Sequence, residues 1–134
     1  MNIVFNILFV GMSYLLGLSV QNPSIVGTWV NESDAKDKYV FESSGLVYSY
    51  YDNQLVATYD YSISNSSPQC GVKVPIDMHT SYLKLTPSIK KLGDHTISKY
   101  DDPEPLCYEI NGITEEHLSL RVVDMGGYTL FRRQ

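Results

Sequence analysis

The feature that most constrains the fold is an alternation of apolar and polar side chains with a period of two, clearest at residues 54–64. One predicted face of this stretch carries mostly apolar and aromatic residues: Leu55, Ala57, Tyr59, Tyr61 and Ile63. The other face carries Val56, Thr58, Asp60 and Ser62. Such alternation is typical of a β-strand that buries one side and exposes the other to water.

The same alternation recurs after residue 20, whereas no stretch keeps a helical period. Further strands are expected at residues 25–31, 38–42, 46–51, 81–86, 106–110, 118–122 and 128–133, with a weak strand at 95–100 and one helical turn at 88–91. Turn residues separate most of them, including Ser43-Ser44-Gly45 and Asp52-Asn53. Residues 65–80 form the longest irregular stretch, a length typical of functional or pinned loops.

About eight or nine short antiparallel strands without crossover helices form a meander, which must hide its edge strands. It can close into an up-and-down barrel or split into a sandwich. An immunoglobulin-type sandwich has its tryptophan between its two cysteines. Trp29 here precedes both cysteines. The sequence therefore favours an all-β fold, an eight- to nine-stranded antiparallel up-and-down β-barrel.

The two ends of the chain carry a complementary pair of residue types. Trp29, the only tryptophan, lies in Gly27-Thr28-Trp29, and the last predicted strand contains Arg132 and Arg133. A guanidinium stacked on an indole would contribute roughly 0.5–2 kcal/mol. This pairing predicts that the final strand returns beside the first.

The 134 residues suffice for one domain with a real core. Residues 1–20 carry no charged side chain and contain an apolar run between Ile3 and Leu18, which predicts a secretory signal peptide. The domain would then span residues 21–134 of a secreted or periplasmic protein without membrane contact after signal removal. The alternative is an uncleaved anchor, since about 18 apolar residues can just span a bilayer.

The formal net charge is −5, and the lysines and arginines are mostly scattered singly. An acidic surface repels phosphate backbones, so nucleic acid is excluded as a partner.

Cys70 and Cys107 are the only cysteines. In an exported chain an even pair predicts one disulfide. It would close a loop of about 36 residues and contribute roughly 3–4 kcal/mol in the chain-entropy model. The alternative, a metal or redox-active site, fits less well because the spacing matches no zinc motif.

Several segments resemble the lipocalin-like (calycin) domains, in particular the short secreted bacterial type. They are Ile25-Val26-Gly27-Thr28-Trp29 at the start, the run formed by residues 108–110 and 113–118, and the ending formed by Leu118-Ser119-Leu120 and Tyr128-Thr129-Leu130-Phe131-Arg132. The resemblance implies a barrel whose closed end holds the tryptophan of the Gly27-Thr28-Trp29 motif beneath a late-strand arginine, here Arg132, with Arg133 as the alternative. The chain is shorter than full-length lipocalins and shows no C-terminal helix, which argues against a deep ligand cavity.

Four tyrosines form the candidate ligand-binding set: Tyr48, Tyr50, Tyr59 and Tyr61. They lie in two neighbouring predicted strands joined by a tight turn, so alternation is expected to place the rings on one face. One interpretation is a pocket wall for an apolar or aromatic ligand. The other is a packed core in which each hydroxyl finds a backbone partner.

Catalytic and metal motifs are not evident. His79, His95 and His117 are separated in the sequence, and no nucleophile-elbow, zinc-protease or paired-carboxylate motif occurs. Asp101, Asp102 and Glu104 could supply oxygen ligands to calcium, but the two prolines beside them restrict how they could converge, and a solvated acidic loop explains them better. We expect neither enzymatic activity, nor a metal, nor a cofactor.

The predicted function is the binding of a small hydrophobic or aromatic molecule inside the barrel of a secreted or periplasmic protein. The alternative is a protein-interaction module with a filled barrel and a partner of unknown identity. Its contact surface would be residues 65–80 and 101–105, joined by the disulfide.

Overall fold

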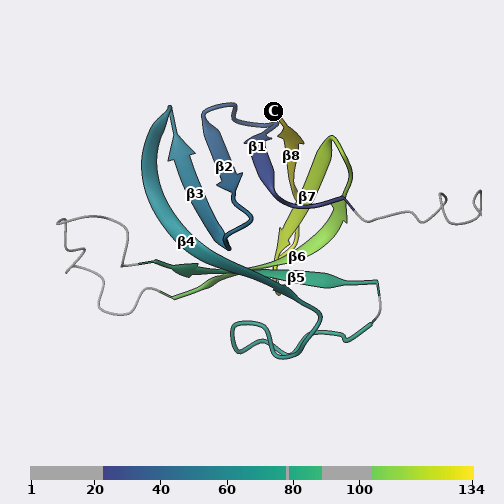
Figure 1. The fold of residues 1–134 in the computed structure, drawn as a ribbon. Coiled ribbons are helices and arrows are strands. Elements are labelled where there is room, and N and C mark those ends of the chain that lie inside the picture. Colours follow the sequence, from purple (N-terminus) through teal and green to yellow (C-terminus); the bar gives the residue numbers. More distant parts are fainter. Residues whose placement is uncertain (1–22, 78, 89–103) are drawn as a thin grey trace, which may run out of the picture.

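The computed structural model describes residues 23–77, 79–88 and 104–134. Each strand in them pairs with the next, and the last pairs with the first, closing an antiparallel barrel (Figure 1). The eight strands are β1 (Gly27–Asn31), β2 (Asp37–Phe41), β3 (Leu46–Tyr51), β4 (Gln54–Ser64), β5 (Ser81–Pro87), β6 (Leu106–Ile113), β7 (His117–Val122) and β8 (Thr129–Arg133). The predicted all-β up-and-down barrel is confirmed, and the sandwich is excluded.

Three expected elements fall outside the described residues. These are the signal peptide at residues 1–20, the helical turn after Ser88 and the weak strand at 95–100. The described part of the chain contains no helix with the length and apolar character that a membrane crossing needs.

Tight turns join most of the strands, as the turn residues predict. At the β3–β4 hairpin Asp52 and Asn53 have φ values of 51° and 63°. Two successive left-handed residues are the signature of a two-residue hairpin loop, and Asp and Asn tolerate that conformation well. This turn sets β3 and β4 side by side in Figure 1.

A β-bulge in the β3–β4 pair changes which residues face outward. The register shifts between Ser49 and Tyr50, so Tyr50 pairs with Leu55 while Ser49 pairs with Ala57. One extra residue on a bulged strand reverses the alternation beyond it. Leu55 therefore lies on the outer face with 46% of its surface exposed, and its expected position beside Ala57 is wrong.

The core lies inside the barrel and consists of Ile25, just before β1, and inward-facing side chains of the strands. Its buried members are Ile25, Trp29, Phe41, Val47, Leu83, Leu85, Leu118, Leu120 and Phe131. The Trp29 indole N–H donates a hydrogen bond of 2.8 Å to the Ile25 carbonyl oxygen. Within the described residues, every buried side-chain nitrogen and oxygen has a partner. The core thus removes apolar surface from water without an unpaired polar group.

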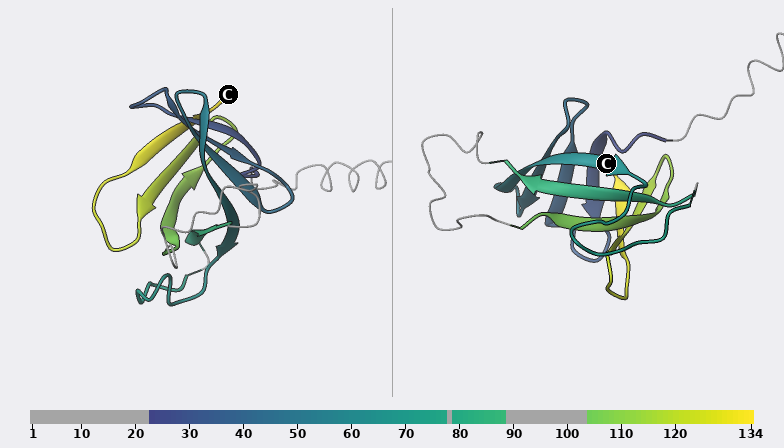
Figure 2. Two further views of the ribbon diagram at one scale, coloured as in Figure 1. Left: turned by 90° about the vertical axis from the view of Figure 1, so that its left-hand side faces the viewer. Right: turned by 90° about the horizontal axis from the view of Figure 1, so that it is seen from below.

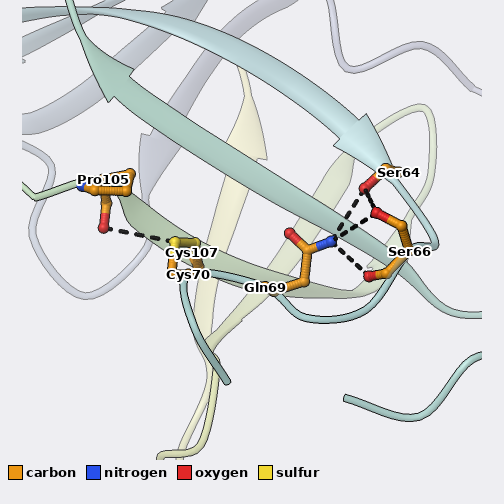
Figure 3. Close-up of a disulfide and its surroundings, with 6 residues drawn as sticks. All are labelled: Ser64, Ser66, Gln69, Cys70, Pro105 and Cys107. Carbon is orange, nitrogen blue, oxygen red and sulfur yellow. Dashed lines mark hydrogen bonds between the residues drawn. A yellow bond between two sulfur atoms is a disulfide. The ribbon is translucent and has the colours of Figure 1, made fainter. Parts of the chain in front are cut away.

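The predicted disulfide between Cys70 and Cys107 is confirmed, with the two Cα atoms 6.2 Å apart. Cys107 pairs with Lys84, on the face opposite the core residue Leu83, so the bond lies outside the barrel (Figure 3). It ties the irregular segment 65–80 to β6. A disulfide of this kind is consistent with an extracellular or periplasmic location.

Hydrogen bonds hold the same segment at two further points. The Gln69 side-chain amide is buried and donates to the Ser66 carbonyl oxygen at 2.6 Å and to the Ser64 hydroxyl at 3.1 Å (Figure 3). The Tyr82 hydroxyl donates to the Pro75 carbonyl oxygen at 3.1 Å. At these points the described residues of segment 65–80 are held against the outer face of the barrel.

Candidate functional site

Trp29 and Arg133 close one end of the barrel, which we call the sealed end. The Arg133 guanidinium carbon lies 4.2 Å from the centroid of the Trp29 ring, and the two residues pair directly between β1 and β8. Directly paired residues of antiparallel strands share a face. The predicted stacking of a late-strand arginine on Trp29 is confirmed, but its assignment to Arg132 is wrong. Arg132 pairs with Val30 and is exposed on the outer face.

Arg133 also binds three backbone carbonyl groups at the sealed end. Its Nη1 and Nη2 donate to the carbonyl oxygens of Val26 and Ser24 at 2.8 and 2.7 Å, and its Nε donates to that of Glu115 at 2.7 Å. The planar guanidinium presents its donors in a rigid fork, which suits several fixed acceptors at once. Arg133 therefore joins the N-terminal segment, β8 and the β6–β7 turn.

Gly27 leaves the room that this arrangement needs. A Cβ atom at this position would lie 2.6 Å from Nη1 of Arg133, and the φ angle of Gly27 is +140°. The conformation disfavours any side chain, and a Cβ atom would displace the Arg133 guanidinium from its position. The structural role predicted for Gly27 thus has a specific cause, the close approach of the guanidinium.

A cavity of about 180 Å³ lies inside the barrel toward the opposite end, which we call the open end. Its apolar and aromatic lining consists of Tyr39, Phe41, Leu83, Leu85, Tyr108, Leu120, Val122 and Phe131. Its polar lining consists of Asn31, Asp37 and Thr129. The rings of Tyr39 and Phe131 meet edge to face, with their centroids 5.7 Å apart. Mostly apolar walls with a few polar groups are typical of ligand sites.

Two tyrosine hydroxyls of the cavity are held in their neutral form. Burial raises the pKa of Tyr39 far above its ordinary value, and the nearby charges of Tyr108, Asp37 and Tyr59 raise it further. Burial also raises the pKa of Tyr108, followed by the charge of Tyr59. These phenols therefore stay protonated at neutral pH, where each can donate one hydrogen bond and accept others.

One carboxylate is part of the cavity wall. Asp37 begins β2, and its Oδ2 accepts a hydrogen bond of 3.0 Å from the Asn31 side-chain amide at the end of β1. The two residues lie at the same end of neighbouring strands. This bond fixes the carboxylate near the cavity while leaving it further acceptor capacity, because a carboxylate has about four lone-pair sites.

The four tyrosines predicted to bind a ligand do not share a face. Tyr48 and Tyr50 alternate with the buried Val47 and Ser49, so both point outward. The amino group of Lys38 lies 5.0 Å from the Tyr50 ring centroid on that outer face. The single-face expectation is wrong because Tyr59 pairs with Val47, which offsets the tyrosines of the two strands by one position.

Tyr59 and Tyr61 do point inward, with different roles. The Tyr61 hydroxyl donates to the Glu42 carbonyl oxygen at 2.7 Å, and its ring meets Phe41 edge to face at 5.1 Å. Tyr61 thus matches the packed-core interpretation. Tyr59 affects the pKa values of both cavity tyrosines and lies next to the site.

Sequence reasoning missed the polar lining of the site, Asn31, Asp37 and Thr129, and its two tyrosines, Tyr39 and Tyr108. Tyr39 lies two positions from Phe41 in β2, and Tyr108 lies two positions from Ile110 in β6, so each shares the face of an apolar residue and the signal of an inward ring was present. Tyr39 also pairs directly with the fully buried Trp29, so both side chains point inward. The missing information was the pairing of strands that are distant in sequence.

A second concavity, of about 390 Å³, lies on the outside of the barrel. We call it the outer groove; it lies between segment 65–80 and the β7–β8 turn. In the left view of Figure 2 this segment lies below the barrel and the β7–β8 turn lies at its lower left. Its floor contains Tyr82, Glu109 and Arg121, and the last two form an ion pair. Exposed Met125 borders it, with Ile76 exposed nearby in segment 65–80.

The histidines contribute no common centre. The Nε2 atom of His117 lies 3.2 Å from Oε1 of Glu32, and His79 is exposed. His95, Asp101 and Asp102 lie outside the described residues. Over the ranges that the structure describes, no three His, Cys, Asp or Glu side chains gather in a way that could hold a metal ion.

Comparisons were made at the levels of sequence family, individual protein and three-dimensional structure. No protein-family model, curated protein or solved structure matches this chain.

Proposed function

We propose that the protein is a secreted or periplasmic, lipocalin-like binding protein for a small hydrophobic or aromatic molecule, without catalytic activity. The observation that carries the proposal is the cavity at the open end. It lies within the barrel, and its walls are mostly apolar and aromatic, with Asn31, Asp37 and Thr129 as the polar exceptions. An eight-stranded barrel has room for its own side chains or for one small ligand.

The cavity volume limits the ligand to about one ring. A cavity of about 150 Å³ lined by aliphatic and aromatic side chains can bind benzene. Drug-sized ligands occupy sites of roughly 300–1,000 Å³. At about 180 Å³, the site here suits the smaller class. Fatty acids, retinoids and haem-like compounds are therefore poorer candidates than single-ring compounds.

The sealed end supports the lipocalin-like part of the proposal. A tryptophan of the first strand lies beneath an arginine of the last strand, as the resemblance implies, although the arginine is Arg133. The disulfide supports export, and residues 1–20 would be the signal peptide.

The test is calorimetric titration of the oxidised domain, residues 21–134, with toluene, phenol and indole. We expect saturable binding of one molecule per chain. A bulky residue at the mouth, Thr129→Phe, should abolish it, because Thr129 lines the cavity. The matched control is Thr86→Phe, which places the same ring on the exposed outer side of β5. Absence of binding, or binding that survives Thr129→Phe, would refute the proposal.

A protein-interaction role is the second candidate, favoured by the outer groove. Ile76, Met125 and Tyr128 are 68%, 64% and 58% exposed around it. Clustered exposed apolar side chains can mark contact sites. Pull-down with Ile76→Ser and Met125→Ser variants tests this role, since unchanged partners would argue against a contact surface there.

A further inference from the structure

The lining of the cavity indicates which chemical class of ligand it prefers, in addition to the size of that ligand. This inference rests on the proposed function. Its polar wall contains one carboxylate, that of Asp37, and no Lys, Arg or His is among its lining residues in the described part of the chain. Within the same ranges, no cationic side chain lies within ion-pair distance of Asp37. A partly buried carboxylate without a cationic partner favours a ligand that supplies one.

The remaining walls suit a cation as well. Tyr39, Tyr108 and Phe131 present aromatic rings around the cavity. Ring faces attract ammonium groups, more strongly where water is excluded. The neutral hydroxyls of Tyr39 and Tyr108 can accept hydrogen bonds from an ammonium group, which has only donors to offer.

The described rim of the open end carries more acidic than basic side chains: Asp34, Asp37 and Asp52 lie there with one lysine, Lys36, whose backbone carbonyl accepts a hydrogen bond from the Asp52 N–H at 3.0 Å. The charge and a hydrogen bond of Asp34 raise the pKa of Tyr51, and the charges of Asp52 and Asp37 contribute further. Three acidic residues thus act at one point where the β1–β2 and β3–β4 turns meet. The nearest strand lysine, Lys38, lies over Tyr50 on the outer face instead. A negative rim attracts cations and repels anions.

We propose that the barrel binds a small organic ammonium ion of one-ring size, with its charged nitrogen paired to the Asp37 carboxylate and its apolar part among the aromatic and aliphatic side chains of the cavity. The carboxylate would accept hydrogen bonds from the nitrogen while still accepting the Asn31 amide. Neutral compounds of equal size would fill the apolar part alone, and carboxylates would be repelled.

The test compares benzylamine, benzyl alcohol and benzoate by calorimetric titration at pH 7, since they share one ring and differ in charge. The wild-type domain should bind benzylamine at least about tenfold more tightly than benzyl alcohol, because hydrogen bonds to charged groups exceed neutral ones. Benzoate should bind most weakly. The comparison of the three compounds on the wild-type domain is sufficient to test the proposal, even where a variant fails to fold.

The variant Asp37→Asn then tests whether Asp37 causes the preference for benzylamine over benzyl alcohol. The new amide can still accept the Asn31 hydrogen bond through its oxygen, so the fold should be kept, as thermal unfolding will show. The variant should lose the tenfold preference while retaining the affinity for benzyl alcohol. The matched control, Asp60→Asn, removes one charge from the exposed outer face of β4 and should leave the preference unchanged.

The outcomes separate the two proposals. Equal affinity for benzylamine and benzyl alcohol, or a preference that survives Asp37→Asn, would overturn the ammonium inference and leave the binding function standing. Failure of all three compounds, together with toluene, phenol and indole, would overturn both.

Discussion

The two ends of the barrel use polar groups in opposite ways. At the sealed end the Arg133 guanidinium stacks on Trp29 and donates to three carbonyl oxygens of its own chain. At the open end the Asp37 carboxylate is fixed by one hydrogen bond from Asn31 and borders a cavity. At the sealed end the donors of Arg133 are paired with carbonyl groups of its own chain, whereas the Asp37 carboxylate keeps further acceptor capacity beside the cavity.

Under the proposed function, this difference assigns stability to one end of the barrel and binding to the other. The sealed end joins the first and last strands, so its contacts keep the barrel closed. At the open end the strands instead surround a cavity, which under our proposal receives the ligand. Substitutions at the sealed end should therefore change the free energy of unfolding, whereas those at the open end should change affinity.

The largest expected effect is that of Trp29→Ala. Trp29 is fully buried, and truncating a buried aromatic residue costs about 3–5 kcal/mol of unfolding free energy. That is a large part of the total stability of a domain this size, about 5–15 kcal/mol. Urea unfolding followed by circular dichroism measures it. Tyr50→Ala on the outer face is the control, and equal losses for both would contradict the assignment of the core.

Arg133→Lys should come next, with a loss of about 1–3 kcal/mol, because lysine cannot reproduce the fork of hydrogen bonds to fixed carbonyl groups. Arg132→Lys is the matched control, an adjacent exposed residue that should stay within about 0.5 kcal/mol. Urea unfolding of the pair measures the contrast. The reverse ranking would show that Arg132, rather than Arg133, closes the barrel.

Arg132 and Arg133 also show which part of the structure could not be predicted from the sequence. The alternation of β-strands, the turn at Asp52 and Asn53 and the closure of the barrel follow from local patterns and were predicted. The choice between Arg132 and Arg133 depends on the pairing of Trp29 with β8, over a hundred residues away in the chain. A slip of one residue exchanges the two faces of a strand, and no local pattern states that register.

The candidate site was harder to predict for the same reason. Tyr48 and Tyr59 each follow the alternation of their own strands, yet they lie on opposite faces because Tyr59 pairs with Val47. Asp37 and Tyr108 reach one cavity from β2 and β6, which do not neighbour each other in the sheet. Only closure of the barrel brings them together.

Alkaline pH should lower the free energy of unfolding, because Tyr39 and Tyr108 lie in the interior of the barrel. Their pKa values are raised in the folded state, chiefly by burial, so the folded state holds these protons more tightly than the unfolded state. Their contribution to stability is fully present below the unfolded pKa of about 10 and is lost as the pH rises from there toward the folded values. Each group adds a slope of up to about 1.4 kcal/mol per pH unit.

Urea unfolding at several pH values above 9 measures this slope. The double variant Tyr39→Phe and Tyr108→Phe removes both titrating groups and should lose stability less steeply, while keeping the cavity rings. An identical slope in the wild type and the double variant would show that these hydroxyls are solvated in the folded state.

Asp77 gives the smallest expected effect and the closest contrast with Asp37. It precedes β5, and its carboxylate accepts hydrogen bonds from the backbone N–H of His79 and Thr80, both at 2.7 Å, and from the Thr80 hydroxyl at 2.9 Å. The N–H of His79 is the first cause that lowers the pKa of Asp77. The carboxylate of Asp77 thus accepts three hydrogen bonds from its own chain, whereas that of Asp37 accepts one.

A lowered pKa means that the folded state holds the ionised form more firmly. The contribution of Asp77 is therefore present above the ordinary carboxylate pKa of about 4 and is lost as the pH falls through the folded value. Because Asp77 is exposed, the effect should be local, seen as faster amide hydrogen exchange at His79 and Thr80 below pH 4 after correction for the intrinsic rate. Asp77→Asn should remove that pH dependence without changing ligand affinity at the open end. If Asp77→Asn weakened ligand binding as Asp37→Asn is expected to do, the proposed difference between the two carboxylates would be wrong.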